Sequence, residues 1–318
     1  TPHVQLQGQA ESMECGNGSQ LTHFMLEGLP YPPKLQVPLF LFFLLIYLLT
    51  LGGNLLILLA VARERRLHKP MYWFLCHLSF LDMTVSSVVV PKVVAGFLPG
   101  GGAISFQGCA AQLFFFHFLG CTEGFLYTVM AYDRFLAICK PLRYHVLMNH
   151  STCQLLAAGT WLGGSLHSTI QTALTFRLPY GRGTRVGYIF CDIPAVLKLA
   201  CGDTALNELV TLVDIGFLMS YVYIVSAILR IRSTEGRRQA FSTCVAHITV
   251  VVTYYVPLVF IYLRPGSQHP LDGVVAVFYT TVTPLLNPLI YTLRNKEMKA
   301  ALMQLGRNTC IQPLGLAK

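Results

Sequence analysis

The chain has 318 residues, of which 54% are hydrophobic and only 12% charged, and its mean hydropathy is +0.56. A soluble domain normally carries about a quarter charged residues, so the composition excludes an ordinary soluble protein and indicates one that crosses a membrane several times. The formal charge of +9 does not indicate a nucleic-acid binder, because the basic residues alternate with hydrophobic runs instead of gathering on one water-facing surface.

Seven hydrophobic runs follow one another along the chain. A bilayer core of roughly 30 Å needs about 20 apolar residues per helix. The runs of about this length are residues 37–62, 71–97, 106–139, 152–176, 205–229, 241–263 and 274–293. They predict an all-α membrane protein in which residues 37–293 form a seven-transmembrane helix bundle, preceded by a tail of residues 1–36 and followed by a segment of residues 294–318.

Lysine and arginine gather in the connections after the first, third, fifth and seventh runs. Short loops rich in these residues stay on the cytoplasmic side, which predicts an extracellular N-terminal tail and a cytoplasmic C-terminus. Residues 1–33 contain no apolar signal segment, so the first helix itself is expected to start insertion. Asn17, in Asn-Gly-Ser, is then an extracellular glycosylation site, whereas the sequon at Asn149 faces the cytoplasm and stays unmodified.

The segment after the last run has the periodicity of an amphipathic helix. Within residues 294–306, Met298, Leu302 and Leu305 fall on one face, and Lys296 and Lys299 fall on another. The pattern predicts a short helix that lies on the inner leaflet.

Polar and charged side chains inside hydrophobic runs are costly and usually functional. Those inside the runs of this chain are Asn54, Asp82, Glu123, Asp133, Arg134, Glu208, Asp214 and Asn287. Asp82 and Glu123 would either join a satisfied internal network or share a cation, since two carboxylates facing one cavity disfavour each other's ionisation. A channel or transporter could use Asp82, Glu123 and Asp214 as a cation path, but the two halves of the chain show no internal repeat that would favour this class.

Several short strings place these polar residues in a recognisable order. They are Gly53-Asn54, Leu78-Ser79 before Asp82, Asp133-Arg134, and Asn287-Pro288-Leu289-Ile290-Tyr291, and together they resemble the rhodopsin-like G-protein-coupled receptors. Longer strings look like the olfactory receptors: LHKPMY at 67–72, MAYDRFLAICKPLRY at 130–144, Ser220-Tyr221, FSTC at 241–244 with His247, and PLLNPLIYTLRN at 284–295. The resemblance extends from near Phe24 to Leu305.

The resemblance implies an odorant receptor of the plasma membrane, which binds a small volatile ligand among its helices and activates a heterotrimeric stimulatory G protein to raise cyclic AMP. It gives Asp133 and Arg134 the role of activation switch, although Phe135 replaces the tyrosine that usually follows them. The other residues implied in coupling are Tyr221, Asn287, Pro288 and Tyr291. Pro288 could equally serve only to kink its helix.

Further partners implied by the resemblance are membrane lipid, receptor-transporting chaperones and a sodium ion at Asp82 and Glu123, beside Asn54 in an internal polar network. The implied ligand pocket is mostly apolar with a few hydroxyl groups. Its lining would be Phe116, His117, Gly120, Cys121, Tyr255, Val259, Tyr262 and Thr280. His117 could orient a ligand or be a packing residue. The sequence contains no readable metal motif and no nucleophile–base–acid set, so the chain is not expected to be an enzyme.

Of ten cysteines, Cys109, Cys191 and Cys201 lie on the predicted outer side together with Cys15, where an oxidising environment allows disulfides. The resemblance implies a Cys109–Cys191 bridge that fixes the long outer loop over the pocket. It also implies that Cys201 stays unpaired, because Gly181 stands where the family has the partner of that cysteine.

The fifth run departs from the family pattern. Only three residues separate Gly216 from Ser220, fewer than the resemblance predicts, and the charge-free stretch 215–229 has 15 residues, or about 22 Å of helix. This is short for a bilayer core of roughly 30 Å, so Asp214 would be drawn into hydrocarbon. The alternative to an active receptor is therefore a receptor-like product that folds weakly and does not signal.

Overall fold

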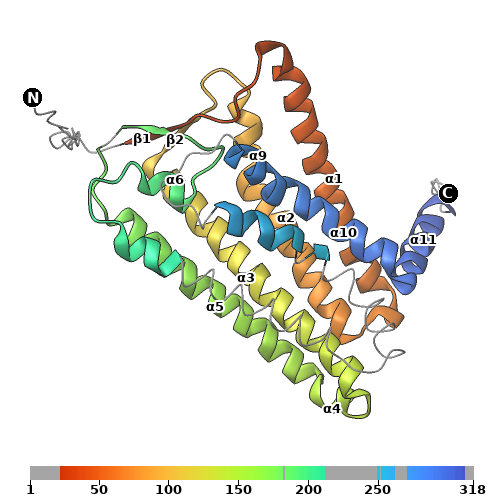
Figure 1. Ribbon diagram of the computed structural model, residues 1–318. Helices are drawn as coiled ribbons and strands as arrows, with labels where there is room; N and C mark the ends of the chain where they lie inside the picture. Colours follow the sequence, from red (N-terminus) through yellow and green to blue (C-terminus); the bar gives the residue numbers. More distant parts are fainter. Residues whose placement is uncertain (1–21, 182, 212–248, 251, 262–270, 312–318) are drawn as a thin grey trace, which may run out of the picture.

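The computed structural model describes residues 22–181, 183–211, 249–250, 252–261 and 271–311, and helices dominate this part of the chain (Figure 1). The longest helices are α1 (Gln36–Arg63), α2 (Pro70–Gly96), α3 (Phe106–Cys139) and α5 (His150–Phe176). They coincide with the first four predicted runs to within two residues at each end. The short elements beside them are η1 (Pro33–Leu35), η2 (Arg65–Leu67), η3 (Pro141–Arg143), α4 (Tyr144–Leu147) and α6 (Ile193–Leu197).

The seventh predicted helix consists of three successive segments. They are α9 (Asp272–Val277), a π-helical turn η4 (Phe278–Val282) and α10 (Thr283–Arg294). π-Helical turns within helices are rare and often occur at functional sites. The fifth and sixth runs fall largely outside the described residues, which are helical at 205–211 and over Val252–Ile261. The predicted shortening of the fifth run also lies outside them and stays a prediction.

Four helical stretches of the described chain are long and apolar enough to cross a membrane. They are Pro33–Arg63, Pro70–Gly96, Phe106–Ala137 and Asp272–Ile290. α5 carries more polar residues than these, but it packs along α3 for most of its length (Figure 1). Helices of this length and packing fit the predicted membrane bundle.

Two of the long helices begin where the sequence provides a side-chain cap. The hydroxyl oxygen of Ser105 accepts a hydrogen bond from the backbone N–H of Gly108 at 3.0 Å, and Oδ1 of Asn149 accepts one from that of Thr152 at 2.9 Å. Such bonds satisfy backbone donors that the first helical turn leaves unpaired. Because Asn149 is the cap, α5 starts two residues before the predicted run.

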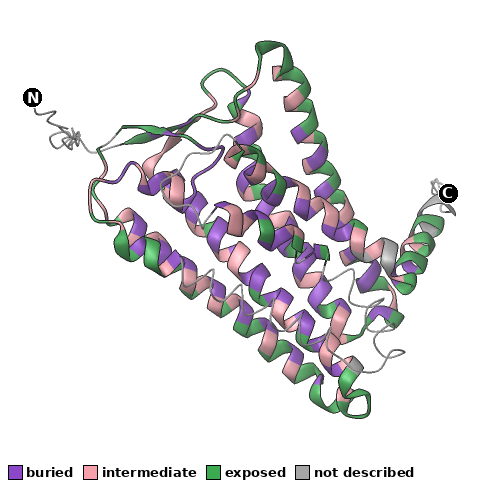
Figure 2. Ribbon diagram, in the orientation of Figure 1, coloured by how far each residue is buried: buried purple, intermediate pink, exposed green. Residues whose placement is uncertain are grey.

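α1 has one face that is buried in the core of the bundle and other faces that are exposed. Its buried residues recur every three or four positions, the spacing of one helical face, and are Phe43, Ile46, Thr50, Asn54, Ile57, Ala60 and Val61. Its other faces expose Leu41, Leu45, Leu48 and Leu55 (Figure 2). Exposed leucines along a whole helix are suited to a hydrocarbon environment rather than to water.

A small sheet at the end of the bundle that is predicted to face outward includes part of the predicted tail. β1 (His23–Leu26) pairs antiparallel with β2 (Ala103–Ser105) and parallel with β3 (Arg185–Val186). Phe24 of β1 is almost fully buried, and its ring centroid lies 5.7 Å from that of Phe106 on α3. Residues 23–26 are therefore a packed part of the outer end rather than a free tail.

The turn between α2 and β2 requires glycine at position 101. A Cβ atom there would lie 1.7 Å from the carbonyl oxygen of Ala95, a distance that no side chain can adopt. The ammonium group of Lys92 donates to the carbonyl oxygens of Gly101, at 2.7 Å, and Ala103. These contacts hold β2 against the end of α2.

The last helix, α11 (Lys296–Ile311), docks on the inner end of the bundle. Its Met298 is fully buried, and the helix packs against α1 and α10. Lys69 Nζ lies 2.7 Å from Glu297 Oε1, and the Tyr72 hydroxyl donates to Glu297 Oε2 at 2.8 Å. The hydrogen bonds from Lys69 and Tyr72 lower the pKa of Glu297. The apolar face predicted for this helix thus rests on the bundle itself.

Candidate functional site

A cluster of buried polar side chains lies deep among the helices. Nδ2 of Asn287, on α10, donates to Asp82 Oδ1 on α2 at 2.8 Å and to the Tyr127 hydroxyl on α3 at 3.2 Å. The Tyr127 hydroxyl in turn donates to Glu123 Oε1. All four side chains are at most 2% exposed. The cluster brings together Asp82 and Glu123, which were predicted to share an internal network, with Asn287, which was predicted as a coupling residue, and it adds Tyr127, which was not predicted.

Asn54 joins α1 to α10 beside this cluster. Its Nδ2 donates to the carbonyl oxygens of Thr50, at 3.0 Å, and Pro284, at 3.2 Å. Pro288 of α10 packs against Gly53, where an added Cβ would lie 3.5 Å from the proline ring. Asn54 and Pro288 therefore act together in the contact between α1 and α10.

Several oxygens of this region have no hydrogen-bond partner in the part of the chain that the structure describes. These buried oxygens are Asn54 Oδ1, Ser79 Oγ, Asp82 Oδ2 and Asn287 Oδ1. Buried oxygens without partners are costly unless water or an ion satisfies them. The set is rich in negative and dipolar oxygen, the ligand type that hard cations prefer.

At the inner end of α3, Asp133 holds Arg134. Asp133 is 1% exposed, and its Oδ2 accepts hydrogen bonds from Nε of Arg134, at 2.9 Å, and from Nη2. The Tyr144 hydroxyl, on α4, donates to the other carboxylate oxygen at 2.6 Å. Burial and the bond to Asp133 raise the pKa of Tyr144. A buried carboxylate is thus paired on both oxygens, as charges out of water must be.

Tyr144 is a site residue that sequence reasoning missed. The available signal was its place in the string MAYDRFLAICKPLRY, which also contains Asp133 and Arg134. Of the other predicted coupling residues, Tyr221 and the side chain of Tyr291 lie outside what the structure describes.

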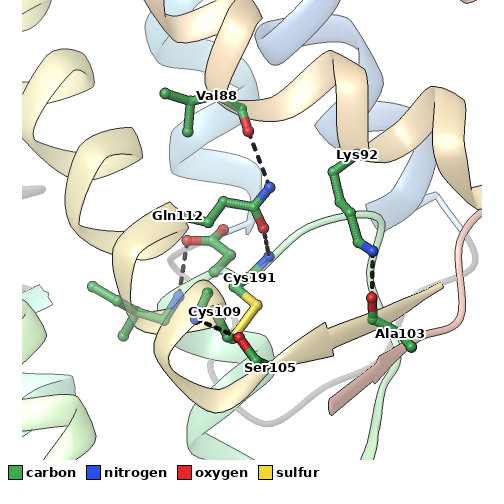
Figure 3. The surroundings of a disulfide bond; sticks show 10 residues. Val88, Lys92, Ala103, Ser105, Cys109, Gln112 and Cys191 are labelled. Atoms are coloured by element: carbon green, nitrogen blue, oxygen red, sulfur yellow. Dashed lines mark hydrogen bonds between the residues drawn. A yellow bond between two sulfur atoms is a disulfide. The ribbon is translucent and has the colours of Figure 1, made fainter. Parts of the chain in front are cut away.

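At the outer end, a disulfide joins Cys109 of α3 to Cys191 of the long loop, so the predicted pairing is confirmed. The Gln112 side chain reinforces this junction, because its Oε1 accepts from the backbone N–H of Cys191 at 2.9 Å while its Nε2 donates to Val88 O at 3.1 Å (Figure 3). The loop is therefore fastened to both α3 and α2.

The prediction for Cys201 is wrong, because this residue is also disulfide-bonded. Cys76, Cys121, Cys139 and Cys153 are free, so none of them is its partner. The prediction failed because it considered only position 181 of the same loop as the source of a partner.

The predicted ligand residues of α3 lie below this junction. The Phe116 ring is 4.7 Å from that of Phe190 in the loop and 6.1 Å from that of Tyr279 in η4, measured between centroids. His117 faces Asp192, with 3.4 Å between Nε2 and Oδ1. Thr280 follows Tyr279 in η4 and is fully buried. Asp192 and Tyr279 had not been predicted, since neither stands out in the sequence.

The sixth helix closes against α3 through two tyrosines. The hydroxyl of Tyr254 donates to Gly120 O at 2.7 Å, and that of Tyr255 donates to Gly124 O at 3.2 Å. Cys121, between these glycines, lies 3.0 Å from Nδ1 of His167 on α5, measured from its Sγ. Val259 is half-buried on the same sixth helix, whereas Tyr262 lies outside the described residues.

Metal-binding clusters of three or more His, Cys, Asp or Glu side chains are not found among the residues that the structure describes.

Comparison with known proteins identifies a family whose members this chain resembles in sequence. A family model described as "Olfactory receptor" matches residues 43–307. Among curated proteins of Homo sapiens, the chain is 64% identical to olfactory receptor 10G6 over 313 residues, which cover 96% of this chain and 94% of that protein. It is 60% identical to olfactory receptor 10G2 over 295 residues, covering 90% and 95%, and 56% identical to olfactory receptor 10S1 over 302 residues, covering 92% and 91%.

Proposed function

The chain belongs to the olfactory receptor family, and we propose that it binds a small volatile odorant within its helix bundle and activates a stimulatory heterotrimeric G protein, which raises cyclic AMP. It is a receptor with a seven-helix membrane fold and not an enzyme. An odorant drives such a receptor only if it binds the active arrangement more tightly than the resting one. The family favours this function over the cation channel that the buried carboxylates left open.

The observation that supports coupling most directly is the paired state of Asp133. Its carboxylate holds Arg134 on one oxygen and accepts from Tyr144 on the other. We propose that this is the resting arrangement, and that activation frees Arg134 to meet the G protein beside Tyr221, Tyr291 and the Asn287-Pro288 region of α10. Charged groups that are restrained by hydrogen bonds at rest can switch when a competing partner is offered.

The proposed odorant site is the region lined by Phe116, His117, Gly120, Cys121, Tyr255, Val259, Tyr262 and Thr280. Aromatic rings from α3, the loop and η4 meet there. Such a lining fits a small, mainly apolar ligand with one or two polar groups.

The buried oxygens around Asp82 fit a sodium ion, which Asp82, Glu123 and Asn287 would hold. A bound cation there would offset the repulsion between the two carboxylates. Replacing Asp82 by asparagine removes one of the charges, so odorant potency in cell membranes should lose its dependence on sodium when sodium is exchanged for a large organic cation. Unchanged sodium dependence in Asp82→Asn would contradict the site.

We further propose a plasma-membrane receptor whose N-terminus is extracellular, delivered with the help of receptor-transporting chaperones and surrounded by lipid on the exposed faces of α1 and its neighbours. Asn17 would then carry glycan, although it lies outside the described residues. Asn149 would not, and its side chain is already the cap of α5. Glycosidase treatment should therefore shift the mobility of wild type and Asn149→Gln but not of Asn17→Gln. A glycan that depends on Asn149 would mean an inverted orientation.

The test of the function is a broad odorant panel applied to cells that express the chain, with cyclic AMP and surface display measured together. A response that depends on the chain supports the proposal. A chain that is displayed but silent across the panel contradicts it. Should the chain stay inside the cell, and should apolar residues inserted after Gly216 restore display and response, the weakly folding product with a short fifth helix is supported instead.

A further inference from the structure

Three side chains from three different elements meet under the outer loop. They are His117 on α3, Asp192 directly after the disulfide-bonded Cys191, and Tyr279 in the π-helical turn η4. Nε2 of His117 lies 3.4 Å from Asp192 Oδ1, and the Tyr279 hydroxyl lies 3.5 Å from Oδ2. The side chains of His117 and Asp192 are only 8% and 1% exposed, so this contact is shielded from water.

Two described contacts of the imidazole ring bear on the proposal. Nδ1 of His117 lies 2.9 Å from the carbonyl oxygen of Leu113, which can only accept a hydrogen bond, so Nδ1 carries a proton. Nε2 faces a carboxylate oxygen that already accepts from the backbone N–H of Ile193 at 2.9 Å. An unprotonated Nε2 would set a lone pair against this oxygen. Among the described contacts, the one between Nε2 and Asp192 is an ion pair only while the imidazole is protonated.

Other titratable groups of the described chain surround this pair. Tyr188, in the same loop, is close enough to Asp192 and Asp272 to feel both charges and donates to the backbone oxygen of Asp272 at 3.4 Å. Lys198, just after α6, is close enough to Asp272 to interact with it electrostatically. Of these acidic groups, Asp192 is the one in contact with His117 and favours a cation there, whereas Lys198 interacts with Asp272.

We propose that His117 and Asp192 form a pH-dependent latch, in which Asp192 is a positioning residue that fastens the long outer loop to α3 and to the seventh helix over the proposed odorant site. The disulfide fixes one point of the loop at Cys191, and the latch fixes the next residue towards η4. The latch is closed while His117 is protonated and is weakened when the proton is lost.

The effect of the latch on ligand binding rests on the proposed odorant function. A closed loop brings Phe190 against Phe116, so an odorant seated there gains contacts that an open loop lacks. The population of the closed form then sets the apparent affinity. Odorant potency is expected to decline as external pH rises, and this decline should be absent in His117→Gln.

The latch itself can be tested without any odorant. Thermal unfolding midpoints of the full-length chain in detergent would be measured by differential scanning calorimetry, which needs no pH-sensitive labelling reaction. The proteins are wild type, His117→Gln, Asp192→Asn and the double variant. They are compared at roughly pH 5.5 and pH 9, on either side of the ordinary histidine value of about 6.5. All four proteins share Tyr188, Asp272 and Lys198, so the cycle cancels the titration of those groups.

At the lower pH, each single variant should unfold on the order of 3 °C below wild type, and the double variant should be no worse than either. Stability from the pair is present where His117 is protonated and is lost as pH rises, so at the higher pH wild type and His117→Gln should unfold together. His23→Gln, which removes an exposed histidine of β1, should follow wild type at both values.

Additive losses at the lower pH, or an equal gap between wild type and His117→Gln at both values, would overturn the latch. If Asp192→Asn does not fold, the comparison of wild type with His117→Gln across pH still decides the matter. The outcome is separate from the odorant screen: a chain that answers no odorant can possess the latch, and an active receptor can lack it.

Discussion

Replacement of Arg134 by alanine is expected to abolish the cyclic AMP response to every odorant while leaving the receptor at the cell surface. The guanidinium group is bound to a single neighbouring carboxylate, and Tyr144 remains to satisfy the other oxygen of Asp133. The buried Asp133 carboxylate loses its cation, which lowers the amount of protein displayed, but the packing of the helices is unchanged, so the response is compared at equal display. The proposed interaction with the G protein, in contrast, loses its cation entirely, because alanine offers no charge to a partner.

The matched control for this experiment is Arg66→Ala. Arg66 is also an arginine of the inner side, but its side chain is 77% exposed and its ion pair with Glu64 is a loose one of 3.8 Å. Such exposed pairs contribute little to stability. Cyclic AMP and surface display should stay near wild-type levels in this variant. A normal odorant response from Arg134→Ala at equal display would refute the proposed switch.

Replacement of Gly164 by alanine is expected to prevent most of the protein from reaching the cell surface. Gly164 lies on α5 where that helix crosses α3. An added Cβ would stand 2.1 Å from the Thr122 hydroxyl oxygen and 2.9 Å from the backbone oxygen of Phe118. Because one of these atoms belongs to the backbone of α3, the helices must separate. Overpacking of this kind costs typically 1–3 kcal/mol, a large share of the stability of a folded protein.

Gly159→Ala, on the same helix, is the control. An alanine there meets nothing within 4 Å, and the position is exposed. Both variants make the same chemical change, so differences in helix propensity cancel between them. Flow cytometry of an N-terminal tag should show wild-type display for Gly159→Ala and a strong loss for Gly164→Ala. Equal display of the two would mean that α3 and α5 tolerate the added methyl group.

The sequence predicted the helices that are marked by long apolar runs. α1, α2 and α3 follow from the length of their apolar runs, and the start of α5 was misplaced only because the cap at Asn149 lies before its run. The strand at residues 23–26 has no such signal, because four residues show no usable period and its pairing depends on distant segments.

Some contacts within the candidate site could be predicted from the sequence, and others could not. The Cys109–Cys191 pair was predictable through a family resemblance, and Asp133 through its place in a hydrophobic run. Asp192 was not, because it lies in a loop and becomes significant only through His117, which is far along the chain. Tyr144 stands in the same string as its partner Asp133, but nothing in that string singles it out. The error on Cys201 arose because position 181 alone was considered as the source of its partner.

The outer sheet has a consequence for the order in which the protein assembles during synthesis. β1 leaves the ribosome first, but its two partner strands, at Ala103–Ser105 and Arg185–Val186, emerge only after α2 and α5 respectively. In the predicted orientation, the first strand waits on the far side of the membrane, with Phe24 exposed, until the chain between these strands has been inserted. Pairings between distant segments form slowly, and a waiting apolar strand is open to aggregation. Shielding of residues 23–26 during this interval would protect the strand until its partners arrive.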